Sequence, residues 1–243
     1  MALLRIPILG LGTGLVALAM LLPALYAAAE RDWATARAFL YAALFSGVAA
    51  AILALALPTG SDRGTARREI TALVALWVVA PAFAALPLAL ATPWLGPGGA
   101  WFEMIAAMTT TGGTAYDDPG ALAGAIHLWR GIVGWLGGLV TLVAAYVILA
   151  PRRLGGFEIE AATWRHAGER AGHAGAGAAV APLESRIARA VRVIGPAYAT
   201  MTLLLGLVLS GTGQGELPAM VHAMAVISTS GISPDPHGFA ATA

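Results

Sequence analysis

Five apolar stretches, each about as long as a membrane-crossing helix, limit what this chain can fold into. A hydrocarbon layer of about 30 Å requires about 20 apolar residues of helix. The composition agrees, because 58% of the residues are hydrophobic and 11% are charged, whereas about a quarter of the residues of a soluble protein are charged. We therefore predict an all-α integral membrane protein, with spans near residues 6–28, 38–57, 70–90, 128–150 and 194–209.

The basic residues lie mostly on one side of these predicted spans. All 14 are arginine, and with a cytoplasmic N-terminus eleven of them fall in inner segments: Arg5, Arg63, Arg67, Arg68, Arg152, Arg153, Arg165, Arg170, Arg186, Arg189 and Arg192. The outer segments hold Arg31 and Arg37, with Arg130 at a helix entrance. Because arginine favours cytoplasmic loops, we predict a cytoplasmic N-terminus and cytoplasmic loops over residues 58–69 and 151–192.

The net charge limits the classes of partner that the chain can bind. A value of only +1 argues against a nucleic-acid partner, because binding to the phosphate backbone depends on many lysine and arginine contacts. Membrane lipid is the partner that the composition predicts.

Two segments of the chain repeat each other. Residues 101–114 read WFEMIAAMTTTGGT, and residues 220–233 read MVHAMAVISTSGIS. Aligned without a gap, they place Gly112 over Gly231, and they place Thr109, Thr110, Thr111 and Thr114 over Ser228, Thr229, Ser230 and Ser233. Each copy is a short apolar segment followed by a turn of Ser, Thr and Gly, so the chain contains an internal repeat.

The apolar part of each copy is too short to cross a membrane. As helices, residues 101–108 and 217–227 would be about 12 to 17 Å long at a rise of 1.5 Å per residue. Non-helical backbone at membrane depth is tolerated only where it is buried in protein or lines a water-filled path. We predict that each segment is a pore helix, over about residues 100–108 in the first copy. Loops that face a pore follow at residues 109–114 and 228–233.

The residue types of these loops suit a path for a cation. Successive backbone carbonyls can replace the water around a cation without a fixed charge that would bind it too tightly. Glycine permits the backbone angles that turn carbonyls toward one axis, and the C-terminal end of a preceding helix carries partial negative charge. These features predict a carbonyl-lined selectivity filter.

The longest motifs resemble a known family. Residues 127–150, HLWRGIVGWLGGLVTLVAAYVILA, together with MTTTGGT and AVISTSGISP, are similar to the membrane subunit of Trk/Ktr-type potassium uptake systems, and the resemblance covers nearly the whole chain. It implies two leading transmembrane helices in residues 1–57, then repeats of helix, pore helix, filter loop and helix. The first repeat, residues 70–150, is complete, and the second, residues 193–243, stops after its filter.

The resemblance also implies the ion, its ligands and the partners. Potassium would bind mainly to the backbone carbonyls of Thr110, Thr111, Gly112, Thr229, Ser230 and Gly231. Because the family has four such repeats, we expect this chain to be the N-terminal half of a longer protein whose C-terminal repeats complete the pore. The family further implies a homodimer, a cytosolic nucleotide-binding regulatory subunit and a bacterial inner membrane.

Other functions remain open from the residues alone. A non-conducting fragment would share every feature above. A secondary transporter of another family also uses repeats and broken helices, but it usually places ionisable residues at mid-membrane, where we expect none. An enzyme is not predicted, because the sequence has no HExxH, GxSxG or GxGxxG motif and no cluster of nucleophile and base.

A few ionisable residues near the predicted filters have two possible roles. Glu103 and His222 occupy equivalent positions in the two predicted pore helices. Glu103 could support the filter electrostatically, but we expect a polar residue near the water interface, and for His222 a hydrogen-bonded packing residue. The aspartates that follow the filters would either concentrate cations at the outer mouth or be solvated turn residues: Asp117, Asp118 and Asp235.

Overall fold

The computed structural model describes residues 8–56, 66–149 and 183–235 of the chain, and within these ranges it contains helices and loops but no strand. Most of the two predicted cytoplasmic loops lies outside the described residues. So do six of the arginines that we place on the inner side: Arg5, Arg63, Arg152, Arg153, Arg165 and Arg170.

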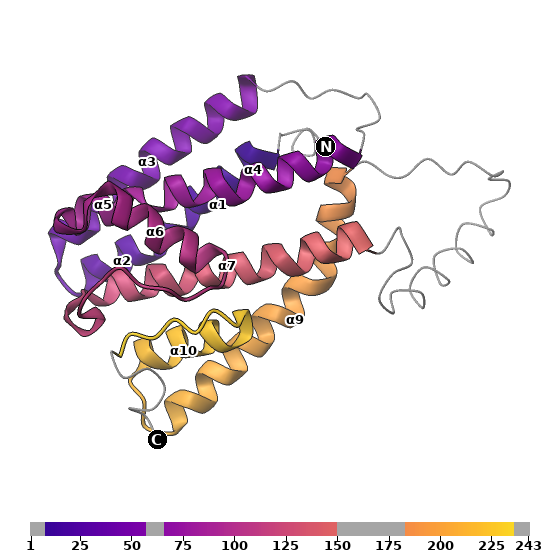
Figure 1. Ribbon diagram of the computed structural model, residues 1–243. Coiled ribbons are helices and arrows are strands. Elements are labelled where there is room, and N and C mark those ends of the chain that lie inside the picture. The colour runs from indigo at the N-terminus through magenta and orange to yellow at the C-terminus, as the bar shows by residue number, and fades with distance from the viewer. Residues whose placement is uncertain (1–7, 57–65, 150–182, 236–243) are drawn as a thin grey trace, which may run out of the picture.

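Five helical spans of the described chain are long and apolar enough to cross a membrane, which confirms the predicted all-α membrane fold. The first combines two consecutive helices, as does the third. In chain order the helices are α1 (Ile8–Ala19) with α2 (Leu21–Ala29), α3 (Trp33–Ala56), α4 (Ala66–Ala84) with α5 (Leu86–Ala91), α7 (Gly124–Leu149) and α9 (Leu183–Gly211). Figure 1 shows α4 and α7 running lengthwise through the molecule, with α9 crossing obliquely beside α7.

Two shorter helices have the same length. α6 (Gly96–Met108) and α10 (Glu216–Ser228) each contain 13 residues, which is about 20 Å of helix. Both pack against α7. α6 begins at Gly96, earlier than the predicted start near residue 100. The reason is Pro97, which lies in the first turn, where a residue without an N–H group costs the helix nothing.

The last long helix also begins earlier than its apolar part. α9 starts at Leu183 and continues through Pro196, so residues 183–192, the last part of the predicted cytoplasmic loop, are helical. The side chain of Arg186 explains part of this extension, because its Nη2 donates a hydrogen bond to the carbonyl oxygen of Val147. That carbonyl belongs to the last turn of α7, where helix carbonyls need a partner outside their own helix.

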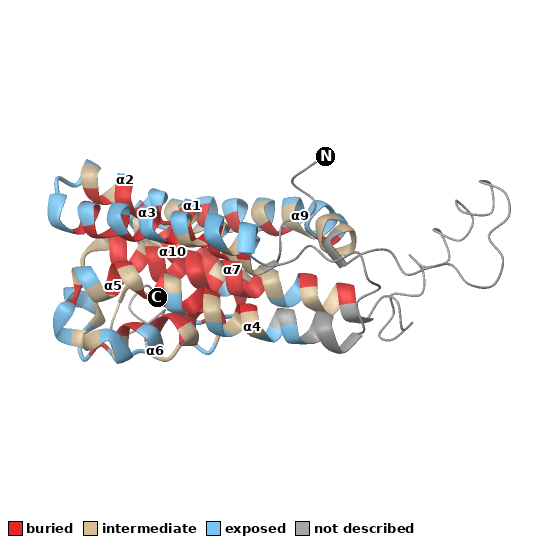
Figure 2. Cartoon of the chain, turned by 90° about the horizontal axis from the view of Figure 1, so that it is seen from above, coloured by how far each residue is buried: buried red, intermediate tan, exposed pale blue. Residues whose placement is uncertain are grey.

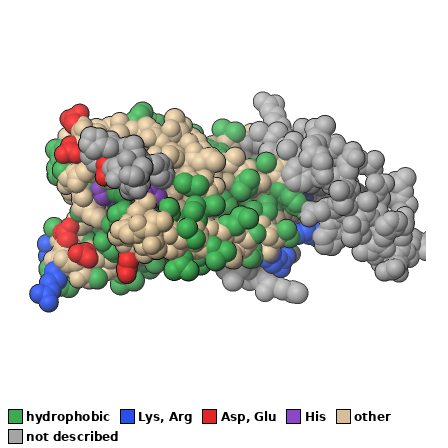
Figure 3. Space-filling view, turned by 90° about the horizontal axis from the view of Figure 1, so that it is seen from below, with side chains coloured by type: hydrophobic (Ala, Val, Ile, Leu, Met, Phe, Trp, Pro, Cys, Tyr) green, Lys and Arg blue, Asp and Glu red, His purple; other side chains and the backbone are tan. Residues whose placement is uncertain are grey.

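The core lies along α7, and the apolar surface lies around the periphery. Figure 2 shows buried residues concentrated where α7 and α10 pack, with exposed residues along the outer helices. The ring of Trp129 is fully buried, its edge contacts Phe39 at 5.8 Å between centroids, and its Nε1 donates to the carbonyl oxygen of Ala84. In contrast, Leu55 and Leu207 are 88% and 72% exposed. On the face drawn in Figure 3, charged side chains gather at the two ends and an apolar belt lies between them, as expected for contact with lipid.

Candidate selectivity-filter loops

The loops that follow α6 and α10 have a left-handed backbone at the same two positions. Thr110 and Thr229 have φ values of 55° and 58°, and Gly112 and Gly231 have φ values of 72° and 68°. The left-handed region is common for glycine and uncommon for threonine. The sequence repeat is therefore also a repeat of an unusual backbone conformation.

The hydrogen bonds at the ends of these two helices repeat as well. In each copy, the N–H groups of two matched residues donate back to carbonyls in the last turn of the helix, and in the first copy the N–H of Gly112 also donates to Ala106 O at 3.2 Å. The matched pairs are Thr110 N to Ala107 O (2.9 Å) with Thr229 N to Val226 O (3.1 Å), and Thr111 N to Ala106 O (2.9 Å) with Ser230 N to Ala225 O (2.9 Å). A left-handed residue with such bonds is a common way to end a helix, so both copies leave their helix by the same turn.

Hydroxyl groups brace each loop internally. Thr109 Oγ1 and Thr111 Oγ1 lie 2.9 Å apart in the first copy, and Ser228 Oγ donates to Ser230 Oγ at 3.0 Å in the second. These bonds join the first and third residues of each loop through their side chains.

The two loops meet at one of the predicted ligand glycines. A Cβ atom placed on Gly112 would overlap the carbonyl oxygen of Ser230. Gly112 is thus required twice, for its positive φ and for the close approach of the second loop. Gly231 has the same φ, but no atom lies within 4 Å of a Cβ placed there.

Two adjacent glycines on α7 allow the ends of α6 and α10 to pack closely against it. A Cβ on Gly137 would overlap the carbonyl oxygen of Met108, the last residue of α6, and a Cβ on Gly138 would lie 2.8 Å from the Cβ of Ser228, the last residue of α10. The ends of both short helices therefore rest on bare backbone of α7. The sequence offered Gly137 and Gly138 only as part of a resembling motif, without this packing role.

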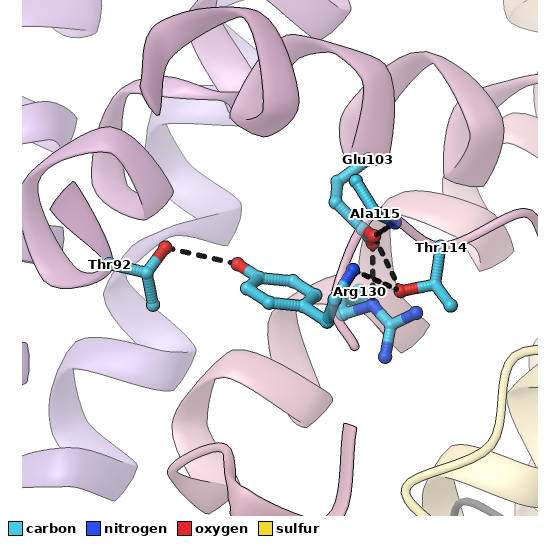
Figure 4. Close-up of polar contacts among 6 residues, drawn as sticks. Thr92, Glu103, Thr114, Ala115 and Arg130 are labelled. Carbon is cyan, nitrogen blue, oxygen red and sulfur yellow. Dashed lines mark hydrogen bonds and ion pairs between the residues drawn. The ribbon is translucent and has the colours of Figure 1, made fainter. Parts of the chain in front are cut away.

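A buried carboxylate holds the C-terminal end of the first loop. Glu103 is 1% exposed, and its Oε1 accepts hydrogen bonds from Thr114 Oγ1 (2.6 Å) and from the backbone N of Ala115. Its Oε2 accepts from Arg130 Nε at 2.9 Å, and Arg130 is 3% exposed (Figure 4). The expectation of a polar residue near the water interface is therefore wrong for Glu103. Arg130 lies near the start of α7, in agreement with its predicted place at a helix entrance, but its side chain is buried. The carboxylate can be buried this deeply because both of its oxygens are hydrogen-bonded and one is paired with Arg130.

A tyrosine ties the same loop to a third helix. Thr92 Oγ1 donates to the carbonyl oxygen of Leu88 in α5 at 2.8 Å, so its hydrogen is used, and the hydroxyl of Tyr116 donates to Thr92 Oγ1 at 3.1 Å. Burial raises the pKa of Tyr116, so the phenol keeps the proton that this bond requires. The Arg130 guanidinium lies 5.7 Å from the centre of the Tyr116 ring. Sequence reasoning did not single out Thr92 or Tyr116.

The second loop is held by a neutral group at the matching position. His222, which aligns with Glu103, is fully buried, and its Nε2 lies 2.9 Å from Ser233 Oγ, the counterpart of Thr114. Its Nδ1 lies 3.0 Å from Gln214 Oε1. A neutral imidazole satisfies both partners, donating at Nδ1 and accepting at Nε2. His222 is thus a hydrogen-bonded packing residue, as predicted.

The predicted potassium ligands share one region but differ in exposure. Thr111, Thr229 and Gly231 are exposed, Thr110 and Gly112 are half-buried, and Ser230 is buried. Among the aspartates beyond the loops, Asp117 and Asp118 are exposed and Asp235 is half-buried. Asp118 Oδ1 accepts from the N of Gly120 at 3.0 Å and caps a short 3-10 turn, Pro119–Ala121. Within the described part of the chain, no three His, Asp or Glu side chains lie together in an arrangement that could hold a metal ion.

The chain is similar in sequence to proteins of Trk systems. It is 35% identical over 170 residues to the Trk system potassium uptake protein TrkI of Halomonas elongata, which covers 69% of this chain and 32% of TrkI. It is 29% identical over 222 residues to TrkH of Escherichia coli K12, which covers 88% of this chain and 42% of TrkH. The chain thus spans about a third to two-fifths of the length of these relatives. No family model matches it.

The fold agrees with a solved structure of the same kind. The crystal structure of the potassium transporter TrkH from Vibrio parahaemolyticus superposes with a TM-score of 0.73 at 24% identity, over 96% of this chain and 45% of that chain. The predicted resemblance to a Trk-type membrane subunit is confirmed by these matches. The relatives are transport proteins, in agreement with the prediction that the chain is not an enzyme.

Proposed function

We propose that this chain, a multi-pass membrane protein that is TrkH-like in sequence and fold, supplies part of a potassium-translocating pore in a Trk-type uptake system. Hydrated potassium would enter from outside, lose water to backbone carbonyls of the two loops, and pass inward. The ligands would be the carbonyls of Thr110, Thr111, Gly112, Thr229, Ser230 and Gly231.

The repeated backbone of the two loops carries this proposal. Positive φ at a threonine costs about 1–3 kcal/mol, and the chain places such a threonine at the same point of both copies, two residues before a glycine of the same kind. Conformations that are costly and yet repeated indicate a function of the backbone. Carbonyl ligation of a cation is the function that suits loops at the C-terminal ends of two short helices.

The exposure of the loops supports an incomplete ring. Thr111, Thr229 and Gly231 are exposed in this chain, although a cation that has lost its water must be surrounded by ligands on all sides. We propose that C-terminal repeats of the same protein cover this side, that the protein is a homodimer, and that a cytosolic nucleotide-binding subunit regulates it.

The topology of the proposal follows from the arginines. Arg186, Arg189 and Arg192 lie at the start of α9, and Arg31 and Arg37 lie near the turn between α2 and α3. An inner location for the first group implies a cytoplasmic N-terminus. We propose the bacterial inner membrane as the location.

Potassium uptake tests the proposal directly. The protein, expressed as its gene encodes it in a bacterial strain without potassium uptake systems of its own, should restore growth at low potassium and take up potassium in preference to sodium. Absence of uptake by correctly inserted protein would support the non-conducting alternative. Uptake whose ion preference is unchanged by Gly112→Ser would instead support a secondary transporter that does not use these loops.

A further inference from the structure

The two loops share a backbone but differ in the charge that holds them, and this difference has to be explained. In the first copy Glu103 bonds to Thr114 and Ala115, and in the second the equivalent His222 bonds to Ser233. Since a neutral ring fastens a loop of the same shape, a charge is not needed to make the turn.

A buried ion pair is not explained by stability either. Removing two charges from water costs several kcal/mol per ion, and a well-packed apolar replacement is often as stable. The distinctive property of Glu103 is its geometry, because Oε1 holds the loop while Oε2 is fastened to Arg130 of α7. Charge-assisted hydrogen bonds are shorter and about twice as strong as neutral ones, so this arrangement restrains the loop more firmly than the histidine can.

The restraint acts on the segment that follows the ligands. Thr114 and Ala115 are the second and third residues after Gly112, so their position sets the path by which the chain leaves the filter. The Arg130 guanidinium in turn lies against the ring of Tyr116, which is bonded to Thr92. Residues 114–116 are therefore held by a charged group on α6, by one on α7, and by the hydrogen bond between Tyr116 and Thr92.

We infer that Glu103 and Arg130 are positioning residues that hold the first filter loop at a fixed distance from the ion path and thereby set its discrimination between potassium and sodium. This inference rests on the proposed function of the loops. It makes the first loop the rigid member of the filter and the second loop the more compliant one.

The test combines an ion-uptake ratio with hydrogen exchange of the loop in the purified protein. Glu103→Gln keeps the shape of the side chain but removes its charge. It should lower the potassium-to-sodium uptake ratio, and it should speed exchange across residues 109–116 by about tenfold or more, the factor expected for a lost hydrogen bond to a charged group. Thr114→Val removes the hydroxyl donor and should act in the same direction, whereas Thr114→Ser keeps the donor and should stay closer to the unaltered protein.

Asp117→Asn is the matched control, because it removes the same charge from an exposed position of the same loop and should leave the uptake ratio and the exchange of residues 109–116 unchanged. The inference is overturned if Glu103→Gln lowers only the yield of folded protein, or speeds exchange without altering the ratio. If the unaltered protein takes up no potassium, the proposed function fails by itself. Exchange then still decides whether Glu103 positions the loop, because equal rates in Glu103→Gln and the unaltered protein would refute it.

Discussion

The two loops that we propose as filter loops are alike in backbone and unlike in the side chains that support them. Both follow a helix of 13 residues, turn at a left-handed threonine and pass through a glycine with φ near 70°. The first is tied to a buried ion pair and, through Tyr116, to Thr92. The second is tied to a buried neutral histidine, which also contacts Gln214.

This comparison separates the residues that form the turn from the side chains that restrain it. The turn itself depends on the helix end, the glycine and local backbone hydrogen bonds, two of which are matched in both copies. The side chains behind the loop only have to supply a partner for the hydroxyl of Thr114 or Ser233. Two chemically different partners can therefore support one backbone shape, with different stiffness.

The largest loss of stability should come from breaking the ion pair between Glu103 and Arg130. Arg130→Met leaves Glu103 buried without its partner, which should reduce the free energy of unfolding by about 3–5 kcal/mol. Gln214→Met, which removes the partner of His222 Nδ1, should cost about 1–3 kcal/mol. Thermal unfolding of the two variants in detergent measures both losses. Equal losses would contradict the inference that the ion pair restrains the first loop more strongly than the histidine restrains the second.

A second test uses the glycines. Gly112→Ser and Gly231→Ser both force a side chain into the left-handed region, at a cost of about 1–3 kcal/mol each. Only Gly112 also lies against a carbonyl of the other loop, so Gly112→Ser should weaken potassium-over-sodium discrimination and stability more than Gly231→Ser does. Relative permeabilities and melting temperatures measure the difference. Unchanged discrimination in Gly112→Ser would count heavily against the filter assignment.

The sequence predicted those features that follow from local pattern. Five apolar stretches became five candidate spans because a helix is the form in which a single segment satisfies its backbone in lipid. The Thr and Gly turns could be found because the chain contains them twice. The hydrogen-bonded role of His222 was also correctly predicted, since a buried histidine usually needs partners.

Long-range partners could not be predicted in this way. Arg130 lies 27 residues after Glu103, and Tyr116 lies 24 residues after Thr92, so neither pair has a spacing that local structure explains. Taken alone, Glu103 resembles any polar residue in the outer part of a helix. The early start of α6 was missed for another reason, because Gly and Pro normally signal a break and here Pro97 occupies a first turn that accepts it.

The neutral support of the second loop can be tested at its centre. His222→Leu removes both hydrogen bonds of the ring and leaves Ser233 and Gln214 without this partner, so it should cost about 1–3 kcal/mol of stability. His222→Gln can restore one of the bonds and should cost less. Thermal unfolding and hydrogen exchange over residues 228–235 distinguish the two variants. A larger loss for His222→Leu than for Arg130→Met would reverse the order of stiffness proposed for the loops.

The smallest effect should come from the tyrosine tie of the first loop. Tyr116→Phe deletes the hydroxyl that bonds to Thr92 but keeps the aromatic ring beside Arg130, so the cost should be that of one neutral hydrogen bond, about 0.5–1.5 kcal/mol. The deletion leaves Glu103 and Arg130 paired. If the ion pair is the main restraint, hydrogen exchange over residues 109–116 should change much less in Tyr116→Phe than in Glu103→Gln. Comparable exchange in the two variants would mean that the charged pair and the tyrosine act as one unit, because loss of either would then release the loop equally.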